Sequence, residues 1–247
     1  MCDNCNLVFF LKQPKYKDIR KLYNNEFFSP SKYYKKLEKS DMKNFSIIFK
    51  EIKKYKKPGK MLDVGCSTGN MIDFARSNGW SVCGIEPNMK SVRECRKKGL
   101  KVSEKPFGEG VYPDNYFDWI HMGDVIEHVK NPIGMLRIAN IKLKKDGILT
   151  LSTPDISKWL TRKFQIKPDE HIFYFDKKTI SKALVKCGFR IVIIRNYAPY
   201  RNISAMAHSS TFKKKSSKFV FNIMSRLGDL IIRIPIKDEL LVIAIKD

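Results

Sequence analysis

The chain is short of acidic residues, of histidine and of long apolar runs. Its longest purely apolar run, Leu240 to Ile245, is far shorter than the roughly 20 residues that a helix needs to cross a bilayer. Residues 1–12 lack a basic lead-in and an extended apolar run, so they do not resemble a secretory signal. The six cysteines lie mostly inside apolar segments, as in reduced proteins rather than disulfide scaffolds. We therefore expect a cytoplasmic protein, and not a transmembrane, secreted or fibrous one.

The shortage of acids leaves a large positive charge. The sequence has 48 Lys+Arg against 25 Asp+Glu, a formal net charge of +23. Such a charge attracts nucleic acid, anionic membrane surfaces and phosphorylated ligands. Most of the excess is lysine spread along the chain, whereas specific recognition of phosphates and bases depends more on arginine. Nucleic acid is therefore admitted as a partner but is not favoured.

Short apolar segments alternate with helical patterns after Pro58-Gly59. Strands are expected at 60–65, 80–85, 101–103, 116–122, 147–152, 189–195 and 239–245. Helices are expected at 70–78, 89–98, 132–143 and 177–187. Strands that alternate with helices of this length indicate an α/β fold with a mostly parallel sheet covered on both faces.

The chain divides at Pro58-Gly59, which ends an amphipathic helix. Phe45, Ile48, Phe49 and Ile52 form the apolar stripe of this helix. We expect residues 1–57 to hold the remnant of a Cys-x-x-Cys module and a capping helix. Residues 58–247 are expected to form the main domain, with an inserted cap segment at about 198–235.

A glycine-containing turn, Asp63-Val-Gly-Cys-Ser-Thr-Gly69, follows the first strand of the main domain. Glycine allows close approach of the backbone to a ligand, and the helix that follows offers free amides at its N-terminus. The spacing G-x-x-x-G differs from the G-x-G-x-x-G of dinucleotide binding. Asp63 would oppose a pyrophosphate but suits a ligand with an ammonium group. Glu86 ends the next strand, where a carboxylate can accept hydrogen bonds from ribose hydroxyls.

Five motifs in order resemble those of class I S-adenosylmethionine-dependent methyltransferases, of the small-molecule type 11/12. They lie at 62–69, 84–87, 117–128, 143–154 and 182–189. Ser67 stands where the family most often has a glycine, and serine is also small. The resemblance implies a Rossmann-like, doubly wound sheet of seven strands, mostly parallel with an antiparallel last strand, and helices on both faces. It also implies S-adenosyl-L-methionine as the cofactor.

The resemblance assigns cofactor-binding positions. Asp63 and the Gly65 backbone would hold the methionine ammonium group, Glu86 would take the ribose hydroxyls, and Phe107 would face the adenine. The predicted cofactor-binding residues are Asp63, Gly65, Cys66, Ser67, Gly69, Glu86, Pro87, Phe107, Met122 and Gly123.

Glu170 and His171 are the predicted catalytic pair. The segment 169–175 resembles a Glu-His-plus-aromatic stretch of relatives that methylate sugar nucleotides or small aromatic precursors. There the histidine can serve as general base, with the acid orienting it. A loop histidine tied to a backbone carbonyl explains the pattern equally well. His128 is expected to shape the cofactor pocket rather than to catalyse, and His121 is expected to be structural.

Two further segments carry weaker signals. Cys2 and Cys5 resemble the second half of the zinc knuckle of some sugar-nucleotide C-methyltransferases, but zinc usually takes four ligands, so no metal is predicted. Residues 213–234 join lysines to an apolar stretch, which leaves peripheral membrane contact open. A helix that caps the substrate pocket or forms a dimer face is favoured. The oligomeric state is not predicted.

The sequence thus predicts a cytoplasmic methyltransferase that uses S-adenosyl-L-methionine and acts on a small-molecule acceptor. A sugar nucleotide or another cell-surface precursor is the leading acceptor class. The alternatives are an RNA methyltransferase, a quinone-precursor O-methyltransferase at a membrane surface, and a non-catalytic S-adenosylmethionine binder. Gly123-Asp-Val-Ile126 stands where an N-P-P-Y-type motif would indicate methylation of a base nitrogen.

Overall fold

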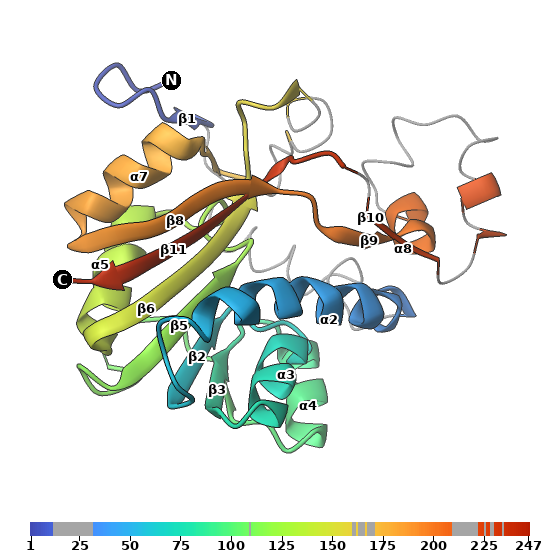
Figure 1. Cartoon of the computed structure of the whole chain (residues 1–247), viewed down its shortest axis with the longest axis horizontal. Helices are drawn as coiled ribbons and strands as arrows, with labels where there is room; N and C mark the ends of the chain where they lie inside the picture. The colour runs from blue at the N-terminus through green and yellow to red at the C-terminus, as the bar shows by residue number, and fades with distance from the viewer. Residues whose placement is uncertain are drawn as a thin grey trace.

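A seven-stranded sheet organises the chain (Figure 1). The computed structural model describes residues 1–11, 32–108, 110–159, 162, 166, 171–208, 222–224, 226–227, 230–233 and 235–247. In spatial order, the strands are β4 (Val102–Ser103), β3 (Ser81–Ile85), β2 (Lys60–Val64), β5 (Phe117–Gly123), β6 (Leu143–Pro154), β11 (Glu239–Lys246) and β8 (Phe189–Tyr197).

The strand directions confirm the predicted topology. Strand β2 is parallel to β3 and β5, and the parallel pairing extends to β4 on one side and to β6 on the other. The last strand of the chain, β11, is antiparallel to both of its neighbours, β6 and β8. The strand order reverses beside β2, and the carboxyl ends of β2 and β5 lie at this switch point, where open α/β sheets form their ligand-binding crevice.

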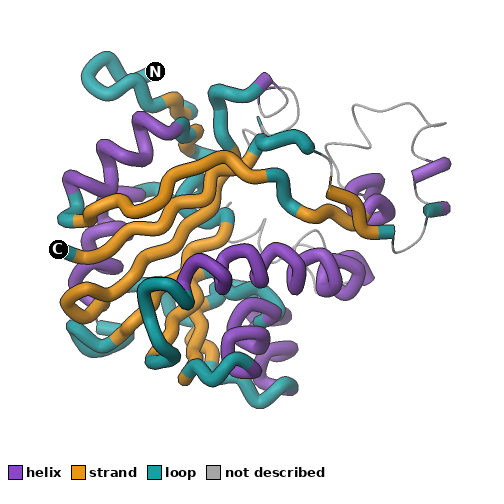
Figure 2. Tube along the Cα trace, in the orientation of Figure 1, coloured by secondary structure: helices purple, strands orange, loops and turns teal. Residues whose placement is uncertain are grey.

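Helices cover both faces of the sheet, as predicted (Figure 2). Helices α5 (Pro132–Lys142) and α7 (Lys177–Lys186) pack on one face, against side chains such as Leu62 and Val242. Helices α2 (Lys32–Ile52) and α3 (Asn70–Ser77) pack on the other, against Met61 and Leu241. Residues that follow each other in one strand, such as Met61 and Leu62, therefore pack against the helices of opposite faces, because successive side chains of a strand point to opposite faces of the sheet. Helix α4 (Met89–Lys97) packs beside α3 through Cys95.

Helix α2 belongs to the core of the sheet domain. Its residues Ile48, Phe49 and Ile52 are buried, as the apolar stripe predicts. The Phe49 ring lies edge-on to Phe74 and Trp119, with centroids 4.8 Å and 5.0 Å away. The helix expected to precede the boundary at 57/58 therefore packs as closely as the helices that follow it.

Smaller elements lie beside this core and were not expected from the sequence. Strand β1 (Val8–Phe9) pairs with β7 (Phe173–Tyr174), and β9 (Tyr200–Asn202) pairs with β10 (Ile231–Arg233). Strand β9 continues into α8 (Ile203–His208). It is held to α2 by Asn44, whose side chain donates to the Tyr200 carbonyl (3.0 Å) and accepts from the Tyr200 amide (2.8 Å).

The predicted cap segment is described in part. The lysines at 213–218 lie outside the described residues. Of the apolar stretch that follows them, Ile223, Leu227 and Leu230 are exposed, with 46–49% of their surface accessible. Among the helices of the described ranges, none is both long and apolar enough to cross a bilayer. Capping of a pocket and contact with a membrane surface both stay predictions.

Candidate functional site

The turn between β2 and α3 has a strained backbone. Gly65, Ser67 and Gly69 all have positive φ angles, of 77°, 48° and 81°. A Cβ atom at Gly65 would lie 2.6 Å from Cγ2 of Val125, so this position has no room for a larger side chain. Gly69 is the N-cap of α3 and has no side chain to bond the first-turn amides. The turn therefore offers backbone donors at the crevice, as predicted for a ligand-binding loop.

Glu86 ties this turn to the end of β3. Its Oε2 accepts from the Ser67 amide and its Oε1 accepts from the Asn88 amide, both at 2.8 Å. Burial raises the pKa of Glu86, and the two amides oppose this effect. Each carboxylate oxygen keeps a further lone pair, so Glu86 can still accept hydrogen bonds from a ligand's hydroxyls.

Asp63 is a buried carboxylate without a protein partner in the described part of the chain. Only 3% of its surface is accessible, and no described residue donates a hydrogen bond to it. Burial raises its pKa well above the ordinary value, and the charge of Glu86 adds to this effect. An unpaired buried charge is costly until a proton or a cation compensates it. This residue therefore fits the ammonium group of S-adenosylmethionine.

The crevice is acidic although the chain as a whole is basic. Asp41 of α2 accepts a hydrogen bond from Asn70 Nδ2 (3.2 Å), while burial and the nearby charge of Asp124 raise its pKa to about 7. Burial also raises the pKa of Glu239, at the start of β11, and the charge of Asp124 contributes again. Both shifts mean that the folded chain favours the protonated, uncharged form of these carboxyl groups, and a bound cation would favour their charged form.

Several predicted cofactor-binding residues can offer only their backbone. The Cys66 side chain is buried in a small cluster with Cys95, and Met122 is fully buried in the main core. Phe107 is half-buried just after β4, where it packs against the same core. Pro87 is exposed beside Glu86, and Gly123 ends β5 at the crevice. Their roles in binding stay predictions.

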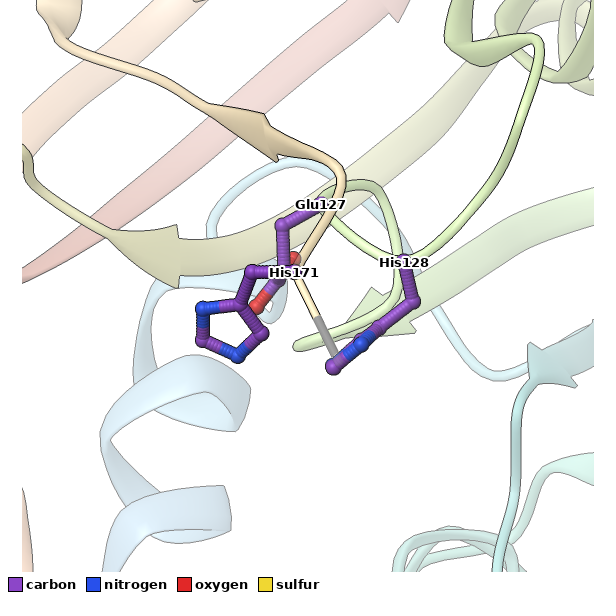
Figure 3. A group of neighbouring side chains, drawn as sticks. All are labelled: Glu127, His128 and His171. Carbon is purple, nitrogen blue, oxygen red and sulfur yellow. The ribbon is translucent and has the colours of Figure 1, made fainter. Parts of the chain in front are cut away.

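His171 lies in a group with Glu127 and His128 (Figure 3). One ligand atom from each side chain lies within 4.8 Å of the other two. The two imidazole rings meet edge to face, with centroids 4.7 Å apart. Glu170, the predicted partner of His171, lies outside the described residues, so the catalytic pair stays a prediction.

Spacing in the sequence does not reveal this group, because the group joins two segments that are far apart in the chain. Glu127 and His128 lie in the turn after β5, whereas His171 precedes β7. His121, by contrast, has the structural position predicted for it. Its Nδ1 lies 2.8 Å from Thr150 Oγ1, and burial lowers its pKa to about 3, so it is a neutral core residue.

The fold and the loop around Gly65 define the class of this protein as a class I methyltransferase. A family model described as a methyltransferase domain matches residues 40–193, from within α2 to within β8. The chain belongs to this methyltransferase family, and its cofactor is S-adenosyl-L-methionine.

Relatives of known sequence match over part of their length. The uncharacterized protein MJ1123 of Methanocaldococcus jannaschii is 25% identical over 144 residues, which are 56% of this chain and 68% of that protein. A ubiquinone biosynthesis O-methyltransferase of Pelagibacter ubique is 28% identical over 160 residues (54% and 66%). Another, of Actinobacillus pleuropneumoniae, is 29% identical over 105 residues (38% and 45%). The matched part thus spans from under half to about two thirds of these relatives.

Solved structures confirm the fold. A SAM-dependent methyltransferase from Archaeoglobus fulgidus superposes with a TM-score of 0.62 at 21% identity, over 87% of this chain and all of that one. A second, from Mesorhizobium loti, has a TM-score of 0.54 at 16% identity, over 76% of this chain and 92% of that one.

Proposed function

We propose that the chain transfers the methyl group of S-adenosylmethionine to a hydroxyl oxygen of a small acceptor. The observation that carries this proposal is the buried pair Asp63 and Glu86 on either side of the Gly65 turn. When bound, the cofactor supplies a methyl group on a positively charged sulfur, and transfer leaves the electron pair of the broken C–S bond on that sulfur. In this proposal Asp63 holds the ammonium group, Glu86 holds the ribose, and the backbone from Gly65 to Gly69 encloses the ligand.

The acceptor class is inferred from the relatives. Two of the relatives named above are O-methyltransferases of ubiquinone biosynthesis, which favours an oxygen nucleophile. A sugar nucleotide, the leading class predicted from the sequence, and RNA have no named relative in their support, so they stay alternatives for the acceptor screen. We therefore favour an acceptor with hydroxyl groups, such as a hydroxylated aromatic ring.

Asp63→Asn tests the cofactor site. The change removes the charge and keeps the shape, so the affinity for S-adenosylmethionine should fall at least about tenfold, or roughly 1.4 kcal/mol. Without ligand, the same variant should unfold at a higher temperature, because it no longer buries an unpaired carboxylate. Titration calorimetry and thermal unfolding measure the two effects. A merely structural role for Asp63 would lower the unfolding temperature and leave the affinity unchanged.

Asp118→Asn is the matched control. Asp118 is also an acid of this sheet, but it lies at the amino end of β5, where it accepts from the Lys60 amide (2.8 Å) and from Lys144 Nζ (2.8 Å). Its loss should affect stability and leave cofactor affinity within about twofold. An acceptor screen that follows release of S-adenosylhomocysteine then tests turnover. Tight cofactor binding without turnover on hydroxylated aromatics, sugar nucleotides or RNA would support a non-catalytic binder instead.

A further inference from the structure

Glu127, His128 and His171 bring two imidazoles and one carboxylate together at the carboxyl end of the sheet. Their ligand atoms lie within 4.8 Å of one another, and the side chains project from two segments toward one region (Figure 3). Bonds of about 2.0–2.1 Å place the ligands of one ion at most about 4 Å apart. Closing the group around an ion therefore requires movements of about an ångström, and His128 is half-exposed whereas Glu127 and His171 are buried.

The backbone holds the two segments in this arrangement. The amides of Ile172 and Phe173 both donate to the Glu127 carbonyl, at 2.8 Å and 3.1 Å, so the residue after His171 is tied directly to Glu127. Thr153 of β6 donates its hydroxyl to Glu127 Oε2 (3.1 Å) and orients the carboxylate. In metal sites, a ligand is oriented by its hydrogen bond to a neighbouring residue that does not itself bind the ion.

We propose that Glu127, His128 and His171 form a binding site for a divalent transition-metal cation. Neutral imidazoles suit zinc and its neighbours in the first transition row better than Mg²⁺ or Ca²⁺, which prefer oxygen ligands alone. Three protein ligands leave at least one coordination position open, which is the pattern of catalytic rather than structural metal sites. The sequence predicted no metal because only Cys2 and Cys5 were considered as ligands, whereas this site is formed by histidine and glutamate side chains.

The charge around the group is consistent with a cation. Glu127, Asp124 and Asp238 act together on Glu239, and Arg201 is the opposing charge, 2.8 Å from Asp238 and 3.9 Å from Glu239. Among the described residues that act on Glu239, carboxylates outnumber the one arginine, so a divalent ion nearby would reduce the repulsion among those that are charged.

The role of the ion rests on the proposed function, whereas its binding does not. An acceptor hydroxyl bound at the open position would lose its proton more readily, because a divalent ion lowers the pKa of a coordinated oxygen. The proton passes to solvent, the oxygen forms the new bond to the methyl carbon, and the C–S electron pair stays on sulfur. His171 then serves as a ligand of the ion and not as the general base predicted from the sequence.

The test measures binding of Co²⁺ and Zn²⁺ to the full chain by calorimetry and by the visible absorption of bound Co²⁺. Cys2 and Cys5 also attract such ions, so every measurement uses the Cys2→Ser, Cys5→Ser background. We expect one ion per chain and a higher unfolding temperature with the ion present. His171→Ala and Glu127→Gln should each weaken binding at least tenfold, and His121→Gln, at a described histidine outside the group, should leave it unchanged.

Cofactor affinity, measured on the same proteins, shows that the variants are folded and keeps the two proposals separate. If His171→Ala does not fold, His128→Ala replaces it, since His128 is less buried. The absence of ion binding, or equal ion affinity in the variants and the parent, would overturn the metal site while leaving the proposed function intact. Ion binding by a chain that does not bind S-adenosylmethionine would support the metal site and overturn the proposed function.

Discussion

Single buried carboxylates determine the chemistry of the crevice. Asp63 and Glu86 flank the same turn, yet they differ in one respect that decides their roles. Glu86 accepts hydrogen bonds from two backbone amides and so holds the loop, whereas Asp63 has no donor among the described residues. Glu86 therefore has a structural role whether or not it binds the ribose, and Asp63 is destabilising unless a proton or a cation compensates its charge.

Asp41 should make stability depend on pH. Its pKa is raised from 3.8 to about 7 in the fold, so the folded chain holds this proton more tightly than the unfolded chain. The contribution of Asp41 to stability is therefore most favourable below pH of about 4, falls as pH rises toward about 7, and is constant above that. Asp41→Asn should remove this contribution and stabilise the chain at pH of about 8 by roughly 4 kcal/mol, because one pKa unit corresponds to about 1.4 kcal/mol.

Denaturant unfolding at several pH values checks this expectation. At pH below about 4 the variant and the parent should be equally stable, because a protonated aspartate and an asparagine are both neutral. Asp3→Asn, a change at an exposed aspartate, is the control and should alter stability at no pH. Equal stability of parent and Asp41→Asn at high pH would mean that Asp41 is well solvated.

Residues of a contiguous motif could be predicted, and residues joined only by folding could not. The turn from Asp63 to Gly69 and the strand end at Glu86 could be recognised because each lies in a contiguous motif, and their contacts with the cofactor stay predictions. The side chains of Cys66 and Met122 point into the core. Their direction depends on backbone angles and on the pleat of the strand, which the motif does not specify. Glu127 and His171 come together through backbone bonds across the crevice, which no spacing in the sequence reveals.

At the scale of elements, the short strand β1 supports the segment that carries His171. Val8 lies opposite Tyr174 and Phe9 opposite Phe173, and the Phe10 amide donates to the Ile172 carbonyl (3.0 Å). The Phe10 ring also lies near the Tyr174 ring, with centroids 6.0 Å apart. Residues 8–10 therefore pair with the segment that follows His171 and help to hold it in place.

Phe10→Pro should make the pairing of β1 with β7 less stable. Proline has no amide hydrogen, so the bond to Ile172 is lost at a cost of about 1 kcal/mol, and the pairing of β1 with β7 weakens. Amide exchange at Phe173 and Tyr174 should become several times faster, as hydrogen exchange with mass spectrometry or NMR would show. Leu11→Pro is the matched control, because Leu11 is 87% exposed. Unchanged exchange in Phe10→Pro would mean that β7 is held without β1.

Periodicity located the long elements and missed the short ones for a physical reason. The strands of the main sheet and helices α3, α4, α5 and α7 bury whole apolar faces, so their positions were predictable to within a few residues. Strands β1, β7, β9 and β10 have two or three residues each, too few to show an alternation. Their existence depends on partners elsewhere in the chain rather than on their own composition.

At the scale of the whole molecule, a basic chain gathers several acidic residues at one end of its sheet. The net charge is +23, while Asp41, Asp63, Glu86 and Glu239 are acids with raised pKa values beside the carboxyl ends of the parallel strands. Basic residues outside the crevice can attract any polyanion, and such attraction is no sign of an RNA substrate.

Salt should separate the two kinds of binding. Between about 50 and 200 mM salt, affinity for single-stranded RNA should fall at least about tenfold, because contacts with phosphates release counterions. Affinity for S-adenosylmethionine should change less than about threefold, since buried charges are screened weakly. Fluorescence anisotropy with a homopolymer and calorimetry with the cofactor provide the comparison. RNA affinity that persists at the higher salt would favour the RNA methyltransferase alternative.

The place of β11 has a consequence for how the chain is made. Strand β8 joins the sheet only through β11, and β11 comes from residues that the ribosome adds about 40 positions later. While the segment between them is being synthesised, β6 has an open edge and β8 has no partner in the main sheet. A nascent chain stalled anywhere in that interval would present both strands to other chains, so its vulnerability to aggregation should end when β11 emerges.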